Sequence, residues 1–74
     1  MNVQSLDSFR DWSIEYCEST QLTTIDAFLV AYQNHCSITI NAHLSEPQKQ
    51  NHKERMLEYL IGVHDHTQLH MYAA

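Results

Sequence analysis

The chain contains one glycine and one proline, Gly62 and Pro47, among its 74 residues. Tight turns between strands usually contain glycine, because most other residues resist positive φ, or proline, which fixes φ near −65°. A chain with so few turn residues therefore favours helices. An apolar fraction of 43% is enough for a packed core, and a chain of this length forms one domain. We expect an all-α fold, with residues 1–74 as a single domain.

The spacing of the apolar residues predicts a small bundle of three to four helices. A first helix over about 6–19 and a second over about 24–36 each have one apolar side. The third covers about 46–61, because Ser45 and Gln48 form a capping pattern and Pro47 suits a first helical turn. A fourth helix over about 66–72 is the alternative to a continuous third. The stretch 37–41 alternates like a strand, but we expect a helix continuation or a loop, since a lone strand leaves its backbone unpaired. A short strand that pairs across a dimer is the minor alternative. The expected stripes are Leu6, Phe9, Trp12, Tyr16 and Cys17 in the first helix and Ile25, Phe28, Leu29, Tyr32 and Cys36 in the second.

Further apolar residues lie outside these stripes. Val30 and Ile38 fall on a second face of the second helix, and Leu57 and Ile61 lie off the main stripe of the third. This is more apolar surface than a three-helix monomer can bury. We therefore expect a homodimer that forms through the second and third helices.

Acidic residues recur along the first predicted helix. Asp7, Asp11, Glu15 and Glu18 span an arc of about 80°, and steps of four residues rise roughly 6 Å along the axis. Ile14 lies beside them and adds an apolar contact. That rise is close to the spacing of phosphates along a nucleic-acid strand, so the stripe resembles a nucleic-acid mimic. The net charge of −5 also disfavours direct binding to phosphates.

These features predict a non-catalytic protein-binding module or inhibitor. Its acidic first helix would dock on a basic surface of a partner protein through Asp7, Asp11, Ile14, Glu15 and Glu18. Small acidic chains without a catalytic motif are typical of inhibitors that phages or mobile elements direct against host nucleic-acid-handling machinery, such as defence nucleases.

Two alternatives remain open. A small DNA-binding regulator would use the basic start of the third helix, Lys49, Lys53 and Arg55. A metal-responsive dimer would use His64, His66 and His70, of which the last two are one helical turn apart. The histidines match no established zinc spacing, so we expect no metal and no other cofactor.

Three classes of protein are not expected. Cys17 and Cys36 lie in apolar stripes, and no phosphate-binding loop or carboxylate pair accompanies them, which argues against an enzyme. The start of the chain does not have the basic and apolar regions of a signal peptide. The longest apolar run, residues 27–32, is far too short to span a bilayer, so we expect a cytoplasmic protein with reduced cysteines.

Overall fold

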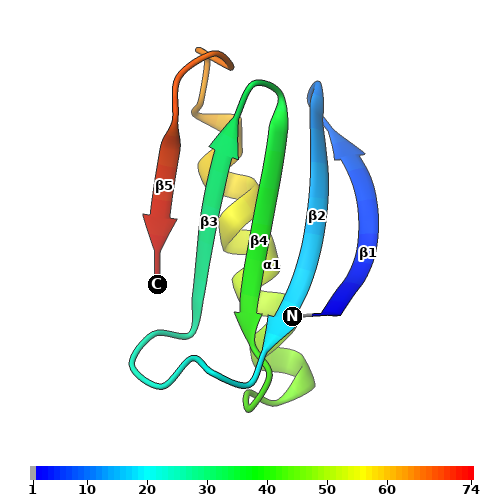
Figure 1. Cartoon of the computed structure of the whole chain (residues 1–74), viewed down its shortest axis with the longest axis vertical. Helices are drawn as coiled ribbons and strands as arrows, with labels where there is room; N and C mark the ends of the chain where they lie inside the picture. Colours follow the sequence, from blue (N-terminus) through cyan, green and yellow to red (C-terminus); the bar gives the residue numbers. More distant parts are fainter. Residues whose placement is uncertain (1) are drawn as a thin grey trace.

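The computed structural model describes the backbone of residues 2–74 and the side chains of residues 8–74. It consists of a five-stranded mixed sheet with one helix across one of its faces (Figure 1). The strand order is β1-β2-β4-β3-β5; β2 and β4 run parallel, and every other neighbouring pair is antiparallel. The prediction of an all-α bundle of three to four helices is therefore wrong. The elements are β1 (Asn2–Phe9), β2 (Trp12–Ser19), β3 (Ala27–Tyr32), β4 (His35–Asn41), α1 (Glu46–Ile61) and β5 (His70–Ala73).

The region predicted as the first helix, 6–19, is instead the hairpin β1–β2. Trp12, Ile14 and Tyr16 alternate along β2 and are all buried beneath α1, whereas Ser13 is exposed and Glu15 is half-buried. Strand alternation places every second side chain on the same face. The aromatic residues were expected on a helix because their spacing also fits a helical turn. In the structure these side chains follow the two-residue period of a strand.

Both hairpins turn without glycine. The loop between β1 and β2 is Arg10–Asp11, the loop between β3 and β4 is Gln33–Asn34, and all four residues have positive φ, between 48° and 70°. Two-residue hairpin loops need this left-handed backbone, and Asp and Asn accept it more readily than most residues do. The scarcity of glycine therefore did not exclude tight turns. The predicted second helix, 24–36, is consequently a loop followed by β3, this turn and the start of β4.

Strand β4 occupies the centre of the sheet. It pairs with β2 on one side and with β3 on the other, so the stretch 37–41 has the backbone partners that the sequence did not reveal. The expectation of a helix continuation or a loop there is wrong. The core lies between this sheet and α1, with Met56 and Leu60 supplied by the helix. The sheet residues of the core are Trp12, Ile14, Tyr16, Ala27, Leu29, Ala31, Cys36, Ile38 and Ile40.

Helix α1 spans the same residues as the predicted third helix. Its N-terminus has the expected capping box: the Ser45 hydroxyl accepts a hydrogen bond from the Gln48 amide, and the Gln48 side chain accepts one from the Ser45 amide at 3.0 Å. The other predicted helices are absent from the described residues, and 66–72 holds a turn and most of β5. Because the second helix does not exist, the expected dimer interface between helices two and three is also wrong.

Removing the cap should weaken the fold measurably. Ser45→Ala is expected to lower the free energy of unfolding by about 1 kcal/mol, because the Gln48 amide in the first turn of α1 loses the hydroxyl that accepts its hydrogen bond. Urea denaturation followed by circular dichroism measures this change. Ser45→Asp, which can still cap, is the control and should stay close to the wild type. Equal stability of the alanine variant would contradict a role for this cap.

Candidate interaction surface

The acidic residues singled out in the sequence do not share a face. Asp11 lies in the β1–β2 turn, Glu15 and Glu18 point to opposite faces of β2, and Ile14 is completely buried. The backbone of Asp7 pairs with that of Ile14 in the hairpin, and the Asp7 side chain lies outside the described residues. The proposed docking stripe depended on a helix and on outward-facing carboxylates. It is therefore not present, and Ile14 cannot contact a partner from the core.

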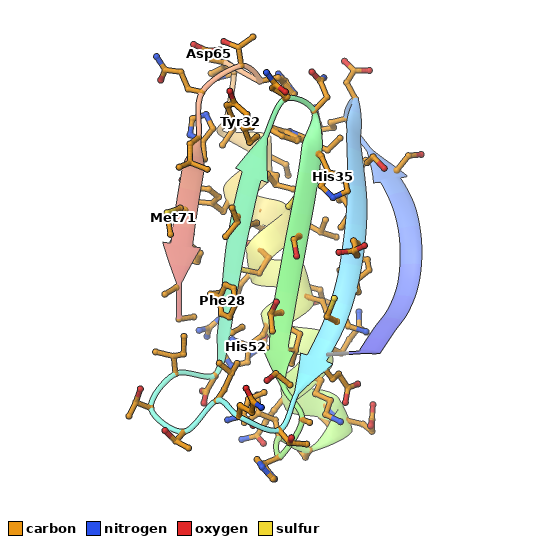
Figure 2. The ribbon with its side chains drawn as sticks, viewed as in Figure 1. Phe28, Tyr32, His35, His52, Asp65 and Met71 are labelled. Carbon is orange, nitrogen blue, oxygen red and sulfur yellow. The ribbon has the colours of Figure 1, made fainter. Side chains whose placement is uncertain are left out.

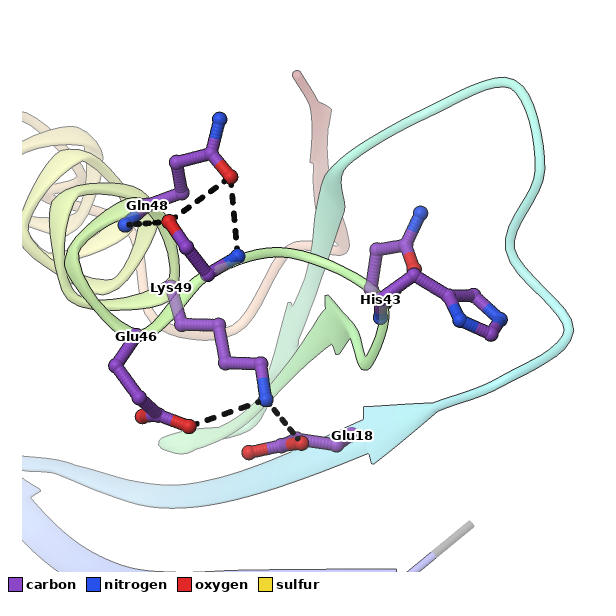
Figure 3. A network of polar contacts seen from close by, with 7 residues as sticks. Glu18, His43, Glu46, Gln48 and Lys49 are labelled. Carbon is purple, nitrogen blue, oxygen red and sulfur yellow. Dashed lines mark hydrogen bonds and ion pairs between the residues drawn. The ribbon is translucent and has the colours of Figure 1, made fainter.

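Glu18 is used inside the fold. Its carboxylate accepts a hydrogen bond from the Lys49 ammonium at 2.9 Å, and Lys49 also contacts Glu46 at 3.3 Å (Figure 3). The hydrogen bond to Glu18 raises the pKa of Lys49 above its ordinary value. This ion pair joins the end of β2 to the first turn of α1. Glu18 is consequently a structural contact between two elements.

The same contacts bear on the basic start of the helix. Lys49 is buried against these two carboxylates, and the Lys53 ammonium lies over the Tyr16 ring, 5.3 Å from its centroid. Arg55 is exposed. Two of the three cations that a DNA-binding site would need are therefore engaged within the chain. No feature of the described structure adds support to the DNA-binding alternative.

The three candidate metal ligands do not converge on one site. His66 stacks on Trp12 with ring centroids 4.4 Å apart, and the His70 ring donates a hydrogen bond to the backbone oxygen of Asp65 at 2.8 Å. His64 is exposed. Among residues 8–74, no group of three or more His, Cys, Asp or Glu side chains is placed to hold a metal ion. His66 and His70 instead make contacts that anchor the segment leading from α1 into β5.

Asp65 organises that segment. Its carboxylate accepts hydrogen bonds from the Thr67 amide at 2.9 Å and from the Thr67 hydroxyl at 2.6 Å. The hydroxyl contact lowers the pKa of Asp65 below its ordinary value. The turn that the Asp65 carboxylate caps directs the chain to the outer side of β3, where β5 adds to the sheet.

Both cysteines are free and buried. Cys36 is completely buried beneath α1, and this burial raises the pKa of its thiol to about 12. Burial also raises the pKa of Cys17, which lies on the other face of the sheet. A nucleophilic cysteine needs a lowered pKa, because the thiolate is the reactive form. Neither thiol has that property.

One half of the uncovered sheet face is apolar. Helix α1 lies behind β3 and β4 in Figure 1, so alternate side chains of the sheet point away from it. Towards β2 this face contains Ser13, Glu15 and Ser37, which are exposed or half-buried, and also Cys17 and Thr39, which are buried. Towards β5 it contains only apolar groups and the ring of a tyrosine. We call these residues the β3–β5 patch: Phe28, Val30, Tyr32, Met71 and Ala73.

The β3–β5 patch leaves large apolar and aromatic side chains exposed to solvent. Met71 is 67% exposed and Tyr32 47%, whereas Phe28 and Val30 are half-buried (Figure 2). A shallow hollow of about 280 Å³ opens beside Phe28, Met71 and Tyr72. Large apolar side chains that gather on one surface are typical of a contact site for another molecule. The patch is the best candidate for the functional surface.

Sequence reasoning placed Phe28 and Tyr32 in the core and Val30 at a dimer interface. Phe28 and Tyr32 share a helical spacing with Leu29, so all three were expected on one buried side. A usable signal was the uncharged run of residues 27–32, which in a strand must turn half of its side chains towards each face. Only the position of the single helix determines which of those faces stays uncovered.

Comparison with protein families, with curated proteins and with solved structures found no match for this chain. Within residues 2–74, no helix has both the length and the apolar character that crossing a membrane requires. The functional argument therefore rests on the chemistry of the described surface.

Proposed function

We propose that this protein is a non-catalytic protein-binding module whose β3–β5 patch contacts an apolar surface on its partner. The observation that supports this proposal is the gathering of exposed Tyr32 and Met71 beside Phe28 and Val30 on the uncovered half of the sheet. Monomeric proteins rarely leave large apolar side chains together in water. Aromatic residues and methionine are also enriched where protein partners meet.

The charge of the chain indicates which kinds of side chain the partner would present. The net charge is −5, and Glu15 lies on the same open face as the patch, two strands away from Val30. A partner with apolar side chains opposite the patch and basic side chains towards Glu15 would complement both features. Nucleic-acid-handling enzymes present such basic surfaces. More specifically, we propose that this protein inhibits an enzyme of this kind by binding to its basic surface.

The nucleic-acid mimic loses its geometric support. It required four carboxylates along one helix, and the strand places Glu15 and Glu18 on opposite faces. In the present proposal the apolar contact supplies most of the binding free energy, and the acidic charge mainly accelerates association. Binding should then depend only moderately on salt, since apolar burial is not screened by ions.

Val30→Lys tests the proposal because it places a charge at the centre of the patch. We expect the affinity for the partner to fall by about 30-fold or more, the effect of losing a strong interface contact. Gln50→Lys is the matched control, since it adds the same charge at an exposed position on α1. Circular dichroism should show that both variants are folded.

The partner is first captured from cells of the source organism with immobilised wild-type protein, and its binding to each variant is then measured by calorimetry. A protein that wild type and Gln50→Lys retain, and that Val30→Lys loses, supports the patch as the site. Equal retention by all three proteins would place the binding site elsewhere. Capture of nothing by the wild type would count against a protein-binding function.

A further inference from the structure

Strand β5 forms one free edge of the sheet, and its outward hydrogen-bonding groups can be assigned. The Ala74 amide donates to the Ala27 oxygen at 2.9 Å, and the Ala27 amide donates to the Ala74 oxygen at 3.4 Å. In antiparallel strands such hydrogen-bonded pairs recur at every second residue. The backbone groups of Tyr72 and His70 therefore face β3, and those of Met71 and Ala73 point away from the sheet.

This edge has few of the features that normally prevent strand pairing. Natural sheets protect their edges with charged residues, proline or bulges, or keep the edge strand short. Residues 69–74 contain no proline and no Asp, Glu, Lys or Arg, and β5 pairs with β3 in a regular register. The four-residue length of β5 is the one protective feature that it has. The segment also exposes two large apolar side chains, Leu69 at 58% and Met71 at 67%.

We infer that a second copy of this chain pairs with β5, strand against strand, in antiparallel orientation about a two-fold axis. The outward groups determine the register. Met71 lies opposite Met71 of the second copy, and Leu69 of each copy lies opposite Ala73 of the other. The two five-stranded sheets then become one continuous sheet, and the two β3–β5 patches lie side by side on the same face. This inference does not depend on the proposed partner protein.

Charge and symmetry favour a second copy as the occupant. Each chain carries a net charge of −5, yet none of the acidic residues belongs to β5 or to its neighbour β3. Two copies can therefore meet at this edge without opposing like charges. The other free edge, β1, contains the acidic residue Asp7 in its sequence, so two copies that paired there would add like charges to the interface. Pairing of β5 with β1 would not close and would form filaments, whereas pairing of β5 with itself closes as a dimer.

The decisive variant is Met71→Pro. Proline removes the Met71 amide hydrogen, which points away from β3, so the sheet of the single chain keeps its hydrogen bonds. The dimer loses the two bonds that the paired Met71 residues would exchange, and we expect its dissociation constant to rise about 30-fold. Met71→Leu retains the amide and the apolar side chain, and it should dimerise like the wild type.

Sedimentation velocity across a range of concentrations up to millimolar measures the dissociation constants of the isolated protein. We expect twice the 8.7 kDa mass of one chain for the wild type and for Met71→Leu, and a shift to the single mass for Met71→Pro. If Met71→Pro does not fold, Met71→Lys replaces it: the amide stays and two ammonium groups face each other, so dissociation is again expected. The Met71 and Ala73 amides should also exchange their hydrogens more slowly at high protein concentration, where the dimer forms.

A wild-type chain that stays monomeric throughout would overturn the inference, as would a dimer that neither variant weakens. Val30→Lys changes a side chain of β3 and no backbone group of the edge. The dimer and the partner-binding proposal can therefore fail separately, because one is measured without a partner and the other with it.

Discussion

Replacement of Ile38 by alanine is expected to lower the free energy of unfolding by about 3–4 kcal/mol. Ile38 is completely buried at the middle of β4, between Tyr16 of β2 and Leu29 of β3 and beneath α1. Truncation removes its apolar contacts and leaves a cavity that central strands cannot easily close. Urea denaturation measures the change. In so small a domain this is a large share of the total stability.

Ser37→Ala is the matched control for this prediction. It changes the preceding residue of the same strand, but on the open face, where Ser37 is half-buried. Its stability should stay within about 1 kcal/mol of the wild type. A loss at Ile38 that is no greater than the loss at Ser37 would contradict the burial of one face of β4. The pair of variants thus tests the period-two alternation directly.

Alkaline pH should destabilise the protein through Cys36. The pKa of this thiol is about 12 in the folded chain and 9.0 when the thiol is fully solvated. Above pH 9 the unfolded chain releases the proton and the folded chain keeps it, so the unfolded state becomes favoured as the pH rises. Between the two pKa values, the contribution of Cys36 to the free energy of unfolding should fall by about 1.4 kcal/mol per pH unit.

The measurement compares wild type with Cys36→Ala in urea at pH 8 and at pH 10.5. All other titratable side chains are the same in the two proteins, so the difference between their unfolding free energies isolates the Cys36 thiol. The wild type should lose about 2 kcal/mol relative to the variant over this interval. A constant difference would show that Cys36 ionises normally in the folded state. Native Cys36 should likewise resist thiol reagents at pH 8.

The two proposed surfaces have different physical origins. The β3–β5 patch consists of side chains that the single helix does not cover, and it would bind a partner by apolar burial. The β5 edge consists of backbone groups that lack a neighbouring strand, and it would bind a second copy by hydrogen bonds. Because β5 contributes to both, dimerisation would align two patches on one face. A dimeric or elongated partner surface would then gain from binding both patches at once.

Helix α1 and the aromatic strand β2 show where prediction from sequence succeeded and failed. The start of α1 depends on Ser45, Pro47 and Gln48, which act within one turn of chain, so its bounds were predictable. In β2, by contrast, Trp12 and Tyr16 fit both a helical turn and a strand. The distinction depends on β4, a partner strand that lies more than twenty residues away in sequence. Local spacing contains no record of such a partner.

The sequence by itself determined the helix over 46–61, the acidic charge and the apolar character of the residues that fill the core. Tertiary structure alone decided that the stretch 2–41 contains four paired strands joined by turns and a loop, since backbone groups in a sheet are satisfied by distant segments. It also decided that Ile14 is buried and that Met71 is exposed. Those outcomes depend on which face of the sheet one short helix can cover, which is a property of the assembled chain and not of any local stretch.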